Sequence, residues 1–205
     1  MIESYVPAMI KCISQMMGKW QDGMKTDMKD EMTDMSIAIT GKTLFNADIT
    51  EEAPEISKAL DTATSLFGRI SLPFSEWLLK LPLPGNLRFY KAKQRLDDIV
   101  SRMINECRKN KMDNGDLVSL LLRTQDENGS GGLSDEEIRD EAITLFLTAF
   151  DTTSTALTWT WYLLSQNPEA EAELHKELDH VLNGRLPVAD INASTHPIPS
   201  GYISD

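Results

Sequence analysis

A run of hydroxyl side chains around one carboxylate occupies residues 148–155, which read Thr-Ala-Phe-Asp-Thr-Thr-Ser-Thr. In a helix, hydroxyls of this kind bond back to carbonyls of the preceding turn, and a carboxylate among apolar residues needs a partner or a shifted pKa. Small side chains beside them would admit a ligand. The Thr152 hydroxyl would hydrogen-bond that ligand, and the Asp151 carboxylate would supply protons through water. The side chains that share one face at helical spacing are Leu145, Ala149, Thr152 and Ala156.

The alternative interpretation of this run is a threonine-rich bundle helix in which Asp151 is buried and satisfied. Both interpretations need a long helix, and residues 134–166 predict one. Ser134 followed by Glu137 forms the pattern of a capping box, and Asn167 with Pro168 ends the segment. A helix of that length spans roughly 50 Å, several times longer than the usual helix of about 11 residues.

The rest of the chain is also predicted to be helical, so we expect a mainly α fold with little or no sheet. Leu72–Asn86 contains three prolines and reads as a short helix within a connection, either a functional cap or a buried linker. Residues 183–205 read as an irregular tail, which leaves 1–182 as the helical portion. Apolar spacing predicts further helices at 3–22, 27–45, 53–68, 87–110, 116–123 and 168–182.

Composition excludes several classes of function. The 205 residues include 32 acidic and 20 basic side chains, a net charge of −12, which argues against nucleic acid and anionic membranes as partners. Residues 142–164 are too rich in hydroxyl groups for a membrane segment. Cys12 and Cys107 are too few for a disulfide framework, which favours a reducing, cytoplasmic location.

No metal-binding pattern stands out. A carboxylate-bridged di-iron bundle needs two Glu-x-x-His motifs, and Glu177 with His180 is the one match in the sequence. These residues lie in a charged segment typical of a solvated helix face. His175 and His196 have no metal-ligand spacing either. The methionines of residues 28–35 are interpreted as a soft core face.

The segment from Leu133 to Pro168 closely resembles the distal-side I helix of cytochrome P-450 monooxygenases. The resemblance rests on Leu-Ser-Asp-Glu-Glu-Ile-Arg-Asp-Glu-Ala-Ile-Thr-Leu-Phe-Leu, on Thr-Ala-Phe-Asp-Thr-Thr-Ser-Thr-Ala-Leu-Thr-Trp and on Tyr-Leu-Leu-Ser-Gln-Asn-Pro. Residues 172–187 resemble the next helix of the family and its exit loop. Earlier residues fit the preceding helices more weakly, including Gly-Lys-Thr-Leu-Phe at 41–45. The chain therefore resembles an internal portion of this family.

This resemblance implies a haem-dependent monooxygenase that inserts one oxygen atom from O2 into a small, apolar organic substrate. It implies that Thr152 helps to protonate dioxygen and that Asp151 feeds this distal relay. Thr148 and Ala149 take the place of a small-residue pair, often Ala-Gly, beside the haem and dioxygen. Alanine in place of glycine narrows that groove. The resemblance further implies an electron donor, either a reductase or a ferredoxin or flavodoxin, and a roof over the substrate pocket at 72–86.

The family's haem-ligating motif, F-x-x-G-x-R-x-C-x-G, is missing from this sequence. Cys12 and Cys107 lack its flanking residues, and no tryptophan begins a W-x-x-x-R pattern. Glu136 and Arg139 match E-x-x-R at a place where the family does not have it. We therefore expect a truncated or frameshifted reading frame whose 205 residues alone retain no haem and are inactive. The alternative is a non-catalytic helical interaction protein, or a relic that binds no haem.

Overall fold

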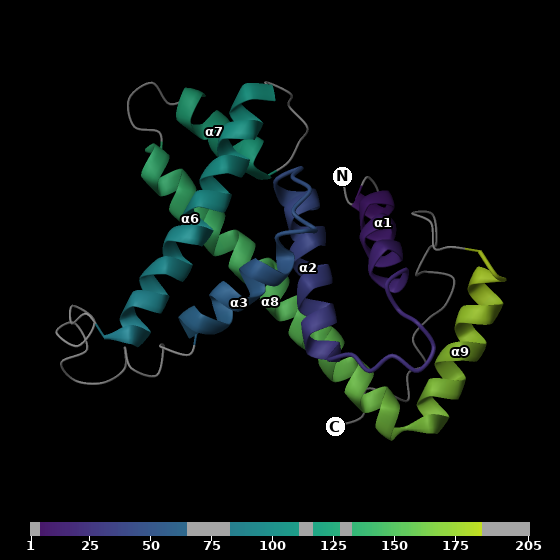
Figure 1. Cartoon of the computed structure of the whole chain (residues 1–205). Coiled ribbons are helices and arrows are strands. Elements are labelled where there is room, and N and C mark those ends of the chain that lie inside the picture. The colour runs from purple at the N-terminus through teal and green to yellow at the C-terminus, as the bar shows by residue number, and fades with distance from the viewer. Residues whose placement is uncertain (1–4, 65–82, 111–116, 128–132, 186–205) are drawn as a thin grey trace, which may run out of the picture.

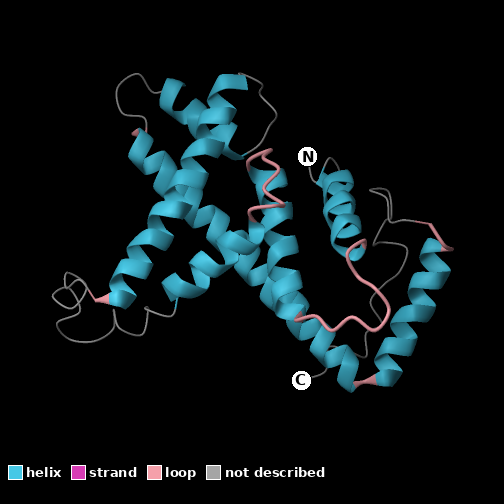
Figure 2. Ribbon diagram, in the orientation of Figure 1, coloured by secondary structure: helices cyan, strands magenta, loops and turns pink. Residues whose placement is uncertain are grey.

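A computed structural model describes residues 5–64, 83–110, 117–127 and 133–185. Within these ranges every regular element is a helix and no strand occurs, as Figure 2 shows, which confirms the mainly α fold class. The helices are α1 (Val6–Met17), α2 (Met28–Leu44), α3 (Ala53–Thr64), α6 (Pro84–Asn110), α7 (Leu117–Glu127), α8 (Asp135–Gln166) and α9 (Pro168–Leu182).

The long helix α8 begins and ends where the sequence predicts. The backbone N–H of Glu137 donates to Ser134 Oγ over 3.3 Å, and the backbone N–H of Ser134 donates to Glu137 Oε2 over 2.8 Å. These two bonds complete the predicted capping box. Glu137 Oε2 accepts hydrogen bonds from both the backbone N–H and the hydroxyl of Ser134, and these bonds lower the pKa of the Glu137 carboxyl. Helix α9 follows directly after Asn167, and its C-cap Asn183 adopts the left-handed conformation with φ of 47°.

Three predicted boundaries were wrong. Helix α1 ends at Met17 and not near residue 22, and the indole of Trp20 instead donates to Glu31 Oε2 of α2 over 3.3 Å. Helix α6 begins at Pro84, a residue tolerated in a first helical turn, so 84–86 belong to α6 and not to the preceding connection. Helix α7 continues to Glu127. The remaining predictions for 65–82, for 128–132 and for 186–205 lie outside the described residues.

Helix α8 is the long central helix, and α2 packs against it more extensively than any other described helix does (Figure 1). Helix α1 lies on α2, whereas α3 lies between α2 and α6. The Phe146 ring of α8 meets the Phe45 ring edge-on with centroids 5.6 Å apart and lies 5.4 Å from the Phe150 ring. Aromatic contacts of this geometry add to the burial energy, so this cluster fixes how α2 and α8 sit together.

The predicted apolar face of α2 is confirmed in part and that of α6 in full. Met32 and Met35 of α2 are buried, as expected for a core face, whereas Met28 and Ile39 at the same spacing are half-buried. In α6, five apolar residues recur at the three- and four-residue spacing that predicts one inward-facing side of a helix, and all five are buried: Leu96, Ile99, Val100, Met103 and Ile104.

Ion pairs tie α3 to both of its neighbours. Near its beginning, Glu55 accepts two hydrogen bonds from Arg95 of α6 at 2.8 and 2.9 Å, and Glu52 pairs with Arg102 at 2.8 Å. The bond from Arg95 lowers the pKa of the Glu55 carboxyl. Near its end, α3 is connected to α2 by Lys29 and Asp61.

Candidate functional site

The predicted ligand-facing side of α8 is open in the structure. Helix α8 buries side chains at four-residue spacing, from Ile138 to Ser154, toward the core. Thr148 and Thr152 lie on the other side and are exposed, and Ala149 is half-buried. The helix therefore presents hydroxyl groups beside a small residue on one accessible face, as helical spacing predicted.

Hydroxyl groups along this face bond to the helix itself. The Thr148 hydroxyl donates to the Thr144 carbonyl over 2.8 Å, and the Thr152 hydroxyl donates to the Thr148 carbonyl over 2.9 Å. This is the back-bonding expected for threonine inside a helix. Each hydroxyl oxygen keeps lone pairs that can accept a further hydrogen bond. The Thr152 hydroxyl can therefore accept a hydrogen bond from one neighbour and, after rotation about χ1, donate its own hydrogen to another.

Asp151 differs from the sequence-based expectation. The local sequence suggested a carboxylate surrounded by apolar side chains, but Asp151 is exposed. The reason is its place on the helix: it lies one residue, or about 100°, beyond the buried Phe150 and faces out of the core. The interpretation as a buried, satisfied aspartate is therefore wrong. An exposed carboxylate can exchange protons with water directly.

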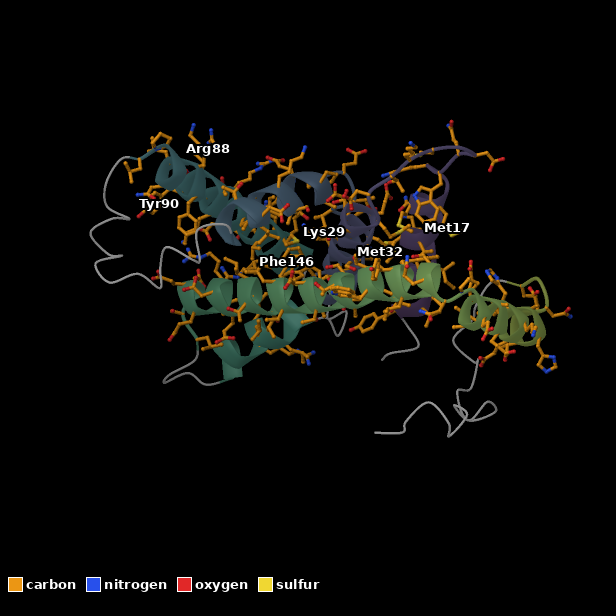
Figure 3. All side chains as sticks on the ribbon, turned by 90° about the horizontal axis from the view of Figure 1, so that it is seen from below. Met17, Lys29, Met32, Arg88, Tyr90 and Phe146 are labelled. Atoms are coloured by element: carbon orange, nitrogen blue, oxygen red, sulfur yellow. The ribbon has the colours of Figure 1, made fainter. Side chains whose placement is uncertain are left out.

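A cavity of about 540 Å³ joins this part of α8 to α2 and α3. Thr148, Asp151 and Thr152 line it, so the structure brings three of the four predicted site residues to one cavity; Ala149 is not among its lining residues. Figure 3 shows Lys29 on the side of α8 that faces α2, together with Met32 and Phe146. The other lining residues are Lys29, Thr33, Ser57, Leu60, Asp61, Leu147, Phe150, Ser154, Thr155, Thr158 and Trp159.

Sequence reasoning missed Lys29 and Asp61. Both are charged residues on helices that the sequence identified by their apolar spacing alone. They lie about ninety residues or more before Asp151 along the chain. No motif links positions so far apart, because the contact depends on how α2 and α3 cross α8. The sequence does show that each of the two is a charged residue close to an end of its helix, but this feature alone does not identify a site.

The two cysteines lie elsewhere. Cys12 is buried in α1 against α2, and burial, followed by the nearby Asp48 carboxylate, raises the pKa of its thiol. Cys107 Sγ of α6 lies 3.3 Å from Ser119 Oγ of α7. Neither thiol belongs to the open face of α8, in agreement with their interpretation as ordinary helix positions. Across the described ranges, no group of three or more His, Cys, Asp or Glu side chains could hold a metal ion.

Two other sequence matches are surface features. Arg139 Nη2 lies 3.6 Å from Glu136 and 3.1 Å from Asp140 at the exposed beginning of α8, an ordinary local ion pair. Glu177 and His180 lie in α9, which buries no residue. The structure thus supports neither an E-x-x-R site nor a di-iron site at these positions.

Comparison with known proteins identifies the class. A model of the cytochrome P450 family matches residues 1–193, so the chain belongs to this family. The heme domain of cytochrome P450DA, solved by crystallography, superposes with a TM-score of 0.75 at 25% identity, covering 93% of this chain and 42% of that one. A triple mutant of the same heme domain superposes with a TM-score of 0.73.

Among its relatives are named oxygenases from Streptomyces. Pentalenene oxygenase from Streptomyces avermitilis is 38% identical over 91% of this chain. Cyclooctatin synthase and cyclooctat-9-en-7-ol 5-monooxygenase from Streptomyces melanosporofaciens are 39% and 33% identical over 82% and 91% of it. The chain spans 37–41% of the length of these relatives. None of the described helices has the length and apolar character that crossing a membrane requires.

Proposed function

We propose that this chain forms the distal side of a cytochrome P450 monooxygenase, which inserts one oxygen atom from O2 into an apolar organic substrate. Thr152 and Asp151 are its proton relay. The observation that carries the proposal is the open face of α8, where Thr152 lies beside a small residue and shares a cavity with Asp151. Membership in the family supplies the class of reaction.

Thr152 is suited to the final transfer of a proton. Its hydroxyl already donates to the Thr148 carbonyl over 2.9 Å, which orients its oxygen lone pairs outward from the helix. A ligand on the exposed face can therefore hydrogen-bond to this oxygen. A positioned hydroxyl that exchanges its proton with a neighbour is a common arrangement for moving protons to a reacting group.

Asp151 is suited to supplying that proton. It is exposed and borders the same cavity as Thr152, which leaves room for water between the two side chains. Neighbouring residues on a helix point about 100° apart, so a bridging water, and not a direct hydrogen bond, would connect them. We assign Asp151 the role of exchanging protons between the cavity and Thr152.

The residues of this chain fit one side of a haem. Thr148, Ala149 and Thr152 form an accessible face with a half-buried small residue at its centre, a surface on which a flat ring can lie. When bound, haem supplies the redox chemistry that activates dioxygen. Cys12 is buried between α1 and α2 and Cys107 Sγ lies beside Ser119 of α7, so we assign neither cysteine as a haem ligand.

The substrate and electron donor are proposed at the level of class. Two relatives carry the names of substrates that they oxygenate, pentalenene and cyclooctat-9-en-7-ol, and both molecules are mainly hydrocarbon. We propose an apolar ring hydrocarbon or its alcohol for this protein too, with a reductase or a ferredoxin or flavodoxin as electron donor. A cytoplasmic location stays a prediction from composition.

The relay is tested by Thr152→Ala in a chain extended to the length of its relatives, with turnover followed as product formed per O2 consumed. We expect this ratio to fall about tenfold or more, because a positioned proton donor contributes at least about 10²-fold. Thr153→Ala is the matched control, since Thr153 is also exposed and donates to the Ala149 carbonyl over 2.9 Å but lies outside the cavity. Equal ratios in both variants would remove Thr152 from the relay.

The assignment of the haem ligand is tested on the 205-residue chain alone. We expect that haem added to it gives no thiolate-type band in the carbon monoxide difference spectrum of the reduced form. The physical reason is that the Cys12 thiol is buried between two helices and Cys107 lies beside α7. A clear thiolate band that Cys107→Ser abolishes would show that this chain holds haem by its own cysteine.

A further inference from the structure

An ion pair between two helices borders the cavity that contains Asp151. Lys29 lies in the first turn of α2 and Asp61 in the last turn of α3, and Lys29 Nζ lies 3.4 Å from Asp61 Oδ1. Both side chains are among the residues that line the cavity, together with Asp151 and Ser154 of α8. The pair therefore lines the cavity on the side where α2 and α3 meet.

The two ends of α3 are attached to different helices. Glu52 and Glu55, near its beginning, are paired with arginines of α6, whereas Asp61, near its end, is paired with Lys29 of α2. If the last pair breaks, both pairs with α6 remain, whereas the end of α3 loses one of its contacts with α2 and can move relative to it. Loss of the ion pair would thus let the cavity widen at this end, while the remaining contacts of α3 keep the helix folded.

We propose that Lys29 and Asp61 are positioning residues that act as a latch, and that the state of this ion pair sets how far solvent and small molecules penetrate the cavity beside Asp151. The inference rests on the proposed function only for the role of Asp151. Access to the cavity itself can be measured without haem, substrate or turnover, so the latch and the proton relay fail independently.

The expected effect is small and measurable. Exposed ion pairs of this kind contribute about 0.2–1 kcal/mol, and a tenfold change in an equilibrium corresponds to about 1.4 kcal/mol. The open population should therefore rise about 1.4- to fivefold when the pair is removed. Screening at about 1 M salt, where the Debye length is about 3 Å, should produce most of the same change in the unmodified chain.

Ser154 provides a probe inside the cavity. Its side chain lines the cavity but only 4% of the residue is exposed, and replacement by cysteine changes its size little. In the full 205-residue chain carrying Ser154→Cys, with Cys12 and Cys107 changed to alanine, we would measure alkylation by a small neutral reagent. Its rate reports how often the buried part of the cavity opens.

We expect Lys29→Met and Asp61→Asn each to accelerate alkylation about 1.4- to fivefold. The double variant Lys29→Asp with Asp61→Lys, which reverses the ion pair, should restore the original rate. A purely electrostatic effect on the thiol introduced by Ser154→Cys would act differently. Lys29→Met removes a cation, which raises the pKa of a nearby thiol and slows alkylation, whereas Asp61→Asn removes an anion, which lowers that pKa and speeds it. The two single variants would then change the rate in opposite directions. That outcome, or no change in either, would overturn the proposal.

The matched control is Lys93→Met, which removes an exposed ion pair with Asp97 of 3.2 Å within α6, outside the cavity. It should leave the alkylation rate unchanged, and acceleration by this variant too would overturn the latch. If Ser154→Cys loses helical content by circular dichroism, hydrogen exchange in the chain with native cysteines replaces it. The amides at the end of α3 should exchange faster in Lys29→Met, and unchanged exchange there would refute the proposal.

Discussion

Among the described residues, Asp34 of α2 is the carboxyl group whose ionisation is most strongly opposed by the fold. Its side chain is half-buried, and this burial, followed by the like charges of Asp30 and Glu31, raises its pKa from 3.8 to about 6. Lys19 and Lys58 act in the opposite direction but do not compensate. We therefore predict that Asp34→Asn, which removes the charge and keeps the shape, stabilises the chain at neutral pH.

The magnitude follows from the shift. A change from 3.8 to about 6 corresponds to about 3 kcal/mol at about 1.4 kcal/mol per pKa unit, and screening by water at this half-buried position reduces it to about 1 kcal/mol. Because the pKa is raised in the folded state, the folded chain binds the proton more tightly than the unfolded chain does. The carboxylate therefore destabilises the fold as pH rises from 3.8 to about 6, and the cost is constant above that.

Urea denaturation of the native chain and of Asp34→Asn measures this difference as a function of pH. The variant should be more stable by about 1 kcal/mol near pH 7, and the difference should shrink toward zero as pH falls to about 4. Asp22→Asn, which removes an exposed carboxylate from the connection before α2, controls for the change in net charge. A stability difference for Asp34→Asn that stays constant with pH, or that Asp22→Asn reproduces, would refute the reasoning.

Two further predictions concern packing within α2. Gly41→Ala should destabilise the chain by about 1–3 kcal/mol in urea denaturation, because an added Cβ would overlap with Cγ1 of Ile49. Unchanged stability would show that the Ile49 side chain and the loop after α2 adjust without cost. Ser36→Ala should stabilise the chain by about 1 kcal/mol in the same assay, since the buried Ser36 hydroxyl has no hydrogen-bond partner among the described residues. A loss of stability would indicate that this hydroxyl is hydrogen-bonded.

Local signals made much of the fold predictable. The capping pattern of Ser134 with Glu137 and the helix stop at Asn167 placed both ends of α8, because these signals act within one turn of the helix. The apolar spacing of α6 identified its buried face. The same reasoning failed at the end of α1, which stops at Met17 with Gly18 as its C-cap, and the Trp20 indole beyond it donates a hydrogen bond to Glu31 of α2.

The candidate site was predictable in part. Helical spacing placed Thr152 beside Ala149, and this holds in the structure because a helix fixes the relative directions of its own side chains. The environment of Asp151 was mispredicted, since apolar neighbours along a sequence do not specify which side of the helix is covered. The cavity also depends on Lys29 and Asp61, whose contribution depends on how two other helices cross α8.

The sequence by itself therefore determined the helical class, the long helix with its caps and the hydroxyl-rich face beside Asp151, because each depends on interactions within a few residues. Only the tertiary structure decided that Asp151 is exposed, that a cavity lies beside it and that the paired Lys29 and Asp61 line that cavity. These features arise where α2, α3 and α8 pack together. Packing of that kind depends on shape and charge complementarity between segments far apart in the chain, which local pattern does not encode.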